Sequence, residues 1–251
     1  MAIKTRKISD WLSANGQAVT NASKATMEDA IRTDIGQLYD GVFIMFHRKS
    51  DNYPLAVRVS SWASYQTGGE IAEGVLLVEG GKHLVIAPTE ASSAKWSSKP
   101  VSSSDTSGSV QISGVTTTSD RIAALNDFAG RANTTAIING STSSNVTNTE
   151  DYAAGFCNRY SRTNANGKGL TAGRWWLPSM GEMAMIWANF DKINYALSKI
   201  NGATQLQTTW YWTSTQASAT NAWYLYLFDG FVGNSYKFNQ IRDRPVSAFL
   251  Y

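Results

Sequence analysis

The side chains best suited to binding a ligand in this chain are the aromatic ones of its C-terminal run, WYWTSTQASATNAWYLYLFDGFVGNSYKFNQIRDRPVSAFLY, at residues 210–251. The alternation at 222–228, AWYLYLF, predicts a β-strand, because successive side chains of a strand point to opposite faces. Trp and Leu fill one face and Tyr and Phe fill the other, so both faces are apolar or aromatic. Since a half-buried strand normally carries polar residues outside, this pattern predicts either a second packed layer or a surface for recognition.

The frame A-W-x-L-x-L-x-x-G-x-V-x-x-x-x-K at Ala222–Lys237, followed by R-x-R-P-V at Arg242–Val246, resembles the C-terminal variable region of diversity-generating retroelement target proteins. In that family, error-prone copying at adenines changes chosen positions and leaves the frame intact. The resemblance implies variable, ligand-binding positions at Tyr211, Thr213, Gln216, Tyr224, Tyr226, Phe228, Asp229, Phe231, Gly233, Asn234, Ser235, Tyr236, Phe238, Asn239 and Ile241, with Ser218 as a further one. It leaves as scaffold Trp210, Trp212, Trp223, Leu225, Leu227, Val232, Pro245 and Val246.

Two further segments carry a resemblance. RWWLPSMGEMAMIW, from Arg174, resembles the R-L-P-[ST]-x-x-E-[WF] helix entry of the formylglycine-generating-enzyme branch of the C-type lectin fold, and GVLLVEGGKHLVIAP, from Gly74, resembles the opening hairpin of phage-encoded members. These likenesses imply an α+β, C-type lectin domain over residues 41–251, with a variable region at about 210–246.

The family resemblance also implies a function. We expect a hypervariable binding protein, a phage tail-associated adhesin that recognises a protein or glycan receptor on a host cell surface; a homotrimer is one assembly that suits a tail tip. A bacterial, non-viral binding protein of the same fold, or a carbohydrate-acting enzyme domain, are the alternatives. Tyr, Ser, Gly, Asn and Asp at the variable positions are also the composition of antibody paratopes.

Catalytic and metal-binding motifs are weak by comparison. His47 and His83 lie in strand-like runs, and Cys157 lies on the apolar stripe of a short predicted helix, which favours a buried, inert thiol. With one cysteine, the chain lacks the cysteine pair of formylglycine-generating enzymes. The Glu-Pro-Asn or Gln-Pro-Asp loop of calcium-dependent lectins is missing. We expect no enzymatic activity, no metal and no cofactor.

Composition limits the partners. The chain has 251 residues, 16% of them charged and 12% aromatic, with nine Trp and a net charge of +3. Its Lys and Arg residues are scattered, so we expect no nucleic-acid partner. The N-terminus lacks the apolar run of a signal peptide, and no stretch approaches the roughly 20 apolar residues that span a bilayer. We therefore expect synthesis in the cytoplasm, no membrane insertion and, if the protein acts outside the cell, release within a virion.

The remaining elements must position the C-terminal region. Residues 1–40 predict a helical arm for attachment or oligomerisation, and strands follow at 41–48, 55–62 and 74–88, with Gly80-Gly81 as a hairpin turn. Residues 97–119, rich in Ser and Thr, predict a surface insertion. Helices are expected at 120–131, at 150–160 and within 174–200, where WWLP ends an extended entry. The last begins with a capping box of Ser179 and Glu182 and continues as an apolar stripe.

Overall fold

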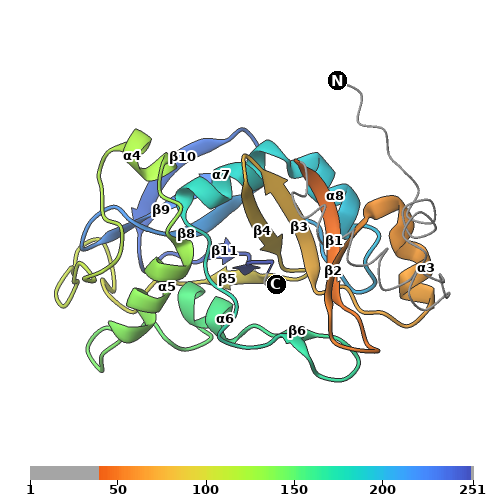
Figure 1. Ribbon diagram of the computed structural model, residues 1–251. Helices are drawn as coiled ribbons and strands as arrows, with labels where there is room; N and C mark the ends of the chain where they lie inside the picture. Colours follow the sequence, from red (N-terminus) through yellow and green to blue (C-terminus); the bar gives the residue numbers. More distant parts are fainter. Residues whose placement is uncertain (1–39, 250–251) are drawn as a thin grey trace, which may run out of the picture. The chain divides into compact units, whose positions relative to one another are not determined.

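The structure is a computed structural model that describes residues 40–249. The helical arm predicted for residues 1–40 therefore lies outside the described residues, apart from Asp40. The described part mixes helices with two mainly antiparallel sheets, so it belongs to the α+β class (Figure 1).

The first sheet has five strands in the order β12-β4-β3-β1-β2, with every neighbouring pair antiparallel. Its turn between β3 and β4 is the predicted one: Gly80 and Gly81 have φ of 55° and 77°, a conformation that glycine adopts without strain. The strands are β1 (Gly41–His47), β2 (Pro54–Arg58), β3 (Gly74–Glu79), β4 (Lys82–Ile86) and β12 (Val246–Ser247).

The second sheet has five strands in the order β10-β9-β8-β11-β5. The three strands of the predicted variable region form an antiparallel meander, and β11 runs parallel to β8. The strands are β5 (Ala91–Ala94), β8 (Trp210–Gln216), β9 (Asn221–Tyr226), β10 (Phe231–Tyr236) and β11 (Ile241–Asp243). A separate hairpin is formed by β6 (Arg162–Thr163) and β7 (Gly169–Leu170).

Helices cover these sheets. The helix α7 (Met180–Ala188) contacts β8 and β9, and α8 (Phe190–Leu197) contacts β1 and β3, so the helix pair joins the two sheets (Figure 1). At the start of α7, the carboxylate of Glu182 accepts a hydrogen bond of 2.8 Å from the backbone N–H of Ser179, as the predicted capping box requires. The other helical segments are the 3-10 turn η1 (Val59–Ser61), α3 (Trp62–Thr67), α4 (Arg121–Leu125), α5 (Gly130–Asn139) and α6 (Ala153–Arg159).

Two apolar clusters make the core. The larger lies between the first sheet, α7, α8 and one face of β9, and it contains the predicted scaffold residues Trp223, Leu225 and Leu227. The smaller gathers Trp96 and Trp212 around the buried thiol of Cys157. The predicted apolar stripe is confirmed on α8, since Ile193, Ala196 and Leu197 are buried, and Ile200, just after the helix, is buried too.

Three predictions about local structure are wrong. The strand expected at 55–62 ends at Arg58 and turns into α3. The helix expected at 120–131 divides at Asp127, whose buried carboxylate accepts hydrogen bonds from Thr215, Asn133 and the Ala129 N–H instead of staying on a helix surface. The segment 97–119 is irregular but does not lie wholly on the surface, because two of its residues, Ile112 and Val115, belong to the smaller cluster.

Candidate ligand-binding surface

The strand β9 separates its two faces as the sequence predicts. Trp223 is 4% exposed and its indole N–H donates a hydrogen bond of 2.8 Å to the carbonyl of Thr118. Tyr224 and Tyr226, on the other face, are partly exposed. A position whose side chain holds the core cannot change freely, whereas one at the surface can. Tyr224 and Tyr226 are therefore the positions of β9 suited to contact a ligand, whereas Ala222, on the same face, is buried.

Strand register places aromatic side chains side by side. Tyr226 of β9 lies opposite Trp210 of β8 and opposite Phe231 of β10, so these three side chains form one row across the sheet. In the next row, Tyr224 lies opposite Gly233. A Cβ atom on Gly233 would approach the Tyr224 ring within 2.7 Å, which shows that the ring covers this glycine.

The rings of five residues form one continuous cluster. Centroid distances are 5.7 Å for Trp210 and Tyr224, 6.0 Å for Trp210 and Tyr226, 6.5 Å for Tyr224 and Phe231, and 5.9 Å for Tyr226 and Phe228. The aromatic cluster is defined here as Trp210, Tyr224, Tyr226, Phe228 and Phe231. Trp210, Phe228 and Phe231 are 50%, 69% and 53% exposed, which is unusual for side chains of this size in contact with one another.

The turn between β9 and β10 is fixed from the other side of the sheet. Gly230 has φ of 77°, and a Cβ atom there would lie within 2.4 Å of the indole of Trp187 on α7. The side chain of Asp229 accepts a hydrogen bond of 2.9 Å from the Phe231 N–H. The helix α7 thus holds the β9–β10 turn that carries Phe228. This part of the aromatic cluster is therefore positioned before any ligand binds.

Tyr211 is not part of this surface, contrary to the prediction. It is fully buried, and its hydroxyl donates to Glu90 at 2.7 Å and accepts from the Gln207 N–H at 2.9 Å. Glu90 also pairs with Arg242 at 2.9 Å and with Arg244 at 2.7 Å. Burial, together with the nearby Glu90 charge, raises the pKa of the Tyr211 hydroxyl. This network explains the R-x-R spacing of the C-terminal motif: both arginines bind one carboxylate.

Thr213 and Gln216 are also buried, so their assignment to ligand binding is wrong. The hydroxyl of Thr213 donates to the carbonyl of Trp223 at 2.8 Å. The side-chain oxygen of Gln216 accepts from the Lys237 ammonium at 2.5 Å and from the Ile112 N–H at 3.2 Å. These contacts fasten the segment 97–119 to the sheet, which is a structural role.

Ile241 is the fourth predicted position that is buried; it is 6% exposed in the smaller cluster. Its neighbour Asp243 is fully buried with the thiol of Cys157 at 3.7 Å. Burial raises the pKa of both groups, which favours a neutral carboxyl and an unreactive thiol.

Other predicted positions lie at the surface but away from the aromatic cluster. Tyr236 and Asn234 fall on the opposite face of β10, because Asn234 pairs with Trp223 across the strands. The rings of Tyr236 and Phe238 stack on each other at 5.4 Å. Asn239 donates a hydrogen bond of 2.6 Å to the hydroxyl of Ser235. The seven aromatic residues considered from the sequence therefore do not converge on one patch.

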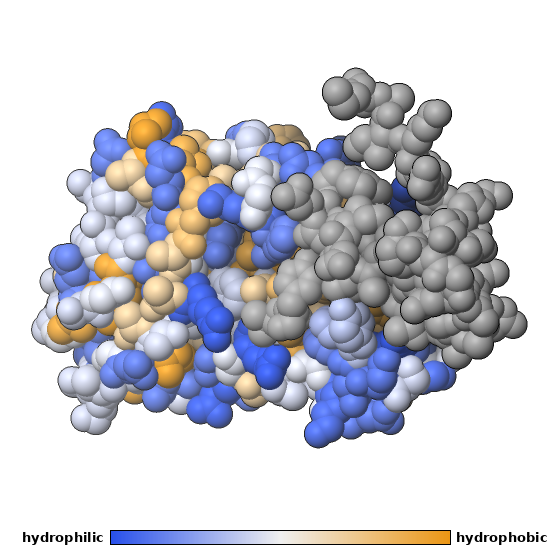
Figure 2. All heavy atoms as spheres, viewed as in Figure 1, coloured by the Kyte–Doolittle hydropathy of each residue, from blue (hydrophilic) through white to orange (hydrophobic). Residues whose placement is uncertain are grey.

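A hollow of about 360 Å³ lies beside the cluster, between α4 and the β9–β10 turn. Asp229, Phe231 and Val232 line it from the hairpin, and Arg121 and Ile122 line it from α4. Ile122 is 62% exposed here. On the face of the molecule shown in Figure 2, apolar surface extends from α4 down over α5.

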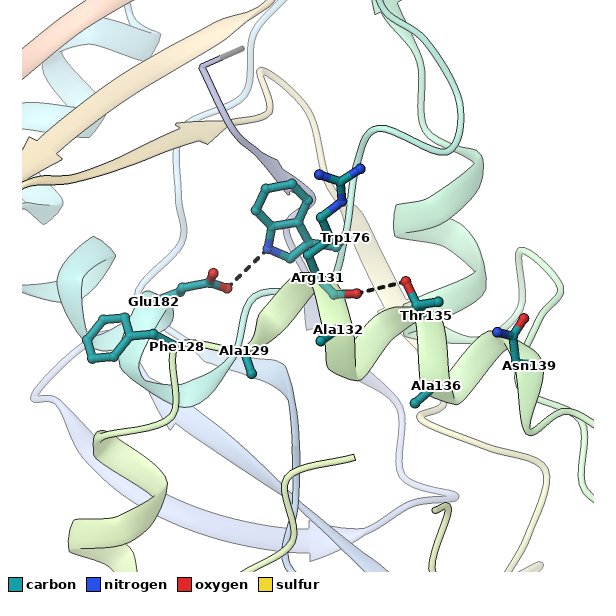
Figure 3. Close-up of a pocket in the computed structure, with 9 residues that line it drawn as sticks. All are labelled: Phe128, Ala129, Arg131, Ala132, Thr135, Ala136, Asn139, Trp176 and Glu182. Carbon is teal, nitrogen blue, oxygen red and sulfur yellow. Dashed lines mark hydrogen bonds between the residues drawn. The ribbon is translucent and has the colours of Figure 1, made fainter. Parts of the chain in front are cut away.

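A second hollow, of about 740 Å³, follows α5 and ends at the capping carboxylate (Figure 3). Glu182 Oε2 accepts hydrogen bonds from the Ser179 N–H at 2.8 Å and from the Trp176 indole at 3.2 Å. Burial raises the pKa of Glu182 to about 7. The backbone of Gly130 covers the carboxylate so closely that a Cβ atom would lie 2.0 Å from it. This carboxylate therefore holds the start of α7 in place.

Trp210 is a surface residue, contrary to the prediction from the sequence. The prediction placed it in the scaffold together with Trp212, and the two do lie on the same face of β8. Trp212 is buried, and its indole N–H donates to the Ala94 carbonyl at 3.0 Å. Trp210, at the start of β8, instead contacts the rings of Tyr224 and Tyr226. Its exposure follows from its cross-strand pairing with Tyr226, which is visible in the structure and not in the sequence.

Residues considered for chemistry are engaged in structural contacts. His47 Nδ1 lies 2.8 Å from the buried carboxylate of Glu73, which also accepts from the Leu170 N–H at 3.0 Å. Among residues 40–249, no three His, Cys, Asp or Glu side chains are grouped so that they could hold a metal ion. In the same range, no helix is long and apolar enough to cross a membrane.

No protein-family model matches this chain, and no curated protein does. Among solved structures, the chain is similar to a fimbrial protein from Bacteroides ovatus ATCC 8483, with a TM-score of 0.41 and 20% sequence identity. The alignment covers 66% of this chain but 36% of the fimbrial protein, so the chain spans about a third of that protein's length. A similarity of this size assigns neither a fold family nor a function.

Proposed function

We propose that this protein is a binding protein whose aromatic cluster recognises a ligand on a cell surface, and that a retroelement diversifies the exposed positions of the β9–β10 hairpin: Tyr224, Tyr226, Phe228, Asp229 and Phe231. In this proposal the scaffold is a C-type lectin fold, and the protein is a phage tail-associated adhesin. The sequence frame at Ala222–Lys237 suggests the family, and the exposed aromatic cluster is the observation that carries the binding function.

The separation of buried and exposed positions supports diversification. Frame residues Trp223, Leu225, Leu227 and Lys237 are buried, whereas Tyr224, Tyr226, Phe228, Asp229 and Phe231 are exposed or half-exposed. A scaffold can accept many side chains at the second set without losing its core. The positions that remain in the proposal are those at the surface; Tyr211, Thr213, Gln216 and Ile241 are withdrawn.

The cluster has the physical properties of a binding hot spot. Tyr, Trp and Phe bury large areas for a small loss of side-chain entropy, and such residues carry most of the binding energy at protein interfaces. The tyrosine hydroxyls add hydrogen-bonding capacity at its edge. Tyrosine hydroxyls are protonated at neutral pH and can donate, and partial burial raises the pKa of the Tyr224 hydroxyl further.

Sequencing the gene from many clones of one lineage tests the proposal without knowledge of the ligand. Adenine-directed substitutions should accumulate at codons 224, 226, 228, 229 and 231 and should be absent from codons 223, 225 and 227. Substitutions spread evenly over both sets would exclude retroelement diversification. Loss of binding to cells after joint Ala substitution at Tyr224, Tyr226 and Phe231, in a protein that stays folded, would support the binding function.

A further inference from the structure

The strand β10 is the outermost strand of its sheet, so one of its two edges has no neighbouring strand. In an antiparallel pair, backbone groups point alternately toward the partner and away from it. The Lys237 N–H donates to the Thr220 carbonyl at 2.9 Å, which places residues of odd number on the side of β9. The backbone N–H groups of Val232, Asn234 and Tyr236 therefore point outward.

These outward groups are unpaired within the described chain. Between residues 40 and 249, no hydrogen bond is made by the N–H of Val232, Asn234 or Tyr236, or by the carbonyls of Val232 and Asn234. The row repeats every second residue, a spacing of about 7 Å. A polypeptide in extended conformation presents donors and acceptors at the same spacing, whereas a glycan does not. The edge is therefore complementary to another β-strand.

The edge of β10 also lacks the features by which proteins block strand addition. Exposed edges usually carry Lys, Pro or a bulge. An outer strand of the first sheet, β2, begins with Pro54 and ends with Arg58. The other outer strand of the second sheet, β5, is followed by Lys95, which forms a β-bridge with Tyr152 at the start of α6. By contrast, β10 has the sequence FVGNSY, with no charge, no Pro and no shift of register against β9.

We propose that the ligand is a protein and that β10 binds an extended segment of it as an added strand of this sheet. This inference rests on the proposed binding function and narrows its ligand class from protein or glycan to protein. Side chains of the added strand would alternate between the two faces. On one face they meet the aromatic cluster; on the other, the hollow of about 360 Å³ beside Val232 and Ile122 accepts one large apolar side chain.

A pair of substitutions at one residue isolates the backbone contribution. Asn234→Pro removes an outward N–H that β9 does not use, and proline is tolerated at such an edge position. Asn234→Ala removes the same side chain, whose oxygen accepts from Asn221 at 3.0 Å, but keeps the N–H. Both variants should keep the melting temperature and circular dichroism of the wild type. The probe is the set of peptides selected against the wild type from a displayed library of random dodecapeptides.

Selected peptides should bind Asn234→Ala nearly as well as the wild type and Asn234→Pro at least about tenfold more weakly, because the proline removes a hydrogen bond and obstructs the edge. Amide exchange at Val232, Asn234 and Tyr236 should slow when a peptide is bound. Equal binding to both variants, unchanged exchange at these amides, or no peptide selected at all would overturn the strand-addition proposal. If Phe231→Ala nevertheless abolishes attachment to cells, the proposed binding function stands without it.

Should Asn234→Pro fail to fold, Val232→Pro and Val232→Ala form a second pair at the next outward N–H. Val232 lies opposite Leu225 on β9, so its N–H also points away from the ladder. The predicted and contradictory results are the same as for the first pair.

Discussion

The ammonium group of Lys237 donates a hydrogen bond of 2.5 Å to the side-chain oxygen of Gln216, and both residues are fully buried. The same ammonium lies 4.5 Å from the ring centre of Trp96 and 3.3 Å from the Val110 carbonyl. A frame residue of the C-terminal motif thus joins β8 to the segment 97–119. Within residues 40–249, no carboxylate pairs with the Lys237 ammonium, so its charge is buried without an opposite charge.

Lys237 should make stability depend on pH. Burial lowers the pKa of its ammonium from 10.5 to about 7 in the folded protein. The unfolded chain therefore binds more protons than the folded one between these values, and stability rises with pH across this window. Relative to Lys237→Met, the wild type should gain up to about 1.4 kcal/mol per pH unit from pH 7 to pH 10 and lose this gain as the pH falls to 7.

Urea unfolding of both proteins at several pH values measures this difference. The exposed Lys199→Met variant is the control, and its profile should parallel that of the wild type. A constant difference between the wild type and Lys237→Met from pH 6 to pH 10 would show that Lys237 is not buried as described.

Glu182 should make the free energy of unfolding fall as the pH rises, in a lower pH range than Lys237. Burial raises its pKa from 4.5 to about 7, so the folded protein binds more protons than the unfolded chain between these values. The stability that this carboxyl contributes is complete below pH 4.5 and is lost as the pH rises through 7. Against Glu182→Gln, whose amide oxygen can accept the same hydrogen bonds, the wild type should become progressively less stable from pH 4.5 to pH 7. Unfolding by urea tests this, with exposed Glu150→Gln as the control.

Truncation of the two faces of the β9–β10 hairpin should have unequal effects. Trp223→Ala removes a buried indole and should cost about 3–5 kcal/mol of unfolding free energy. Phe228→Ala and Phe231→Ala alter exposed rings and should each cost less than about 1 kcal/mol. Thermal and chemical unfolding of the three variants would contradict the assignment of faces if Phe228→Ala were the most destabilised.

Removal of one hydroxyl should distinguish Tyr211 from Tyr224. Tyr211→Phe removes one of the hydrogen bonds to Glu90, which keeps its two arginines, and takes the acceptor away from the Gln207 N–H, so it should cost about 1–3 kcal/mol. Tyr224→Phe changes a half-exposed ring and should cost less than about 0.5 kcal/mol. Similar losses for the two variants would mean that Tyr211 is not held in the Glu90 network.

Features set by local sequence were predictable. The glycine pair at 80–81 forms the expected turn, Glu182 caps α7, and the alternation at 223–227 separates buried from exposed side chains. Each depends on residues within a few positions of one another, where turn chemistry, capping and period-two alternation act.

Features set by distant partners were not predictable. Tyr211 is buried because Glu90, 121 residues earlier, accepts its hydroxyl, and Gln216 is buried because Ile112 and Lys237 bind it. Nothing near Trp210 and Trp212 in the sequence reveals that the smaller cluster covers the second and stops short of the first. Periodicity gives the face of a strand, but the length of strand that other segments cover is decided by tertiary packing.

The β9–β10 hairpin joins a fixed buried face to a replaceable aromatic surface, and these two faces should differ in their tolerance of substitution. The most direct measurement is a saturation library over residues 210–246, displayed on cells and sorted for resistance to protease. Positions 224, 226, 228, 229, 231 and 234 should accept most side chains, and positions 211, 216, 223, 225, 227 and 237 should accept few. Equal tolerance in the two sets, or tolerance at 223 and 225 with intolerance at 224 and 226, would contradict the account.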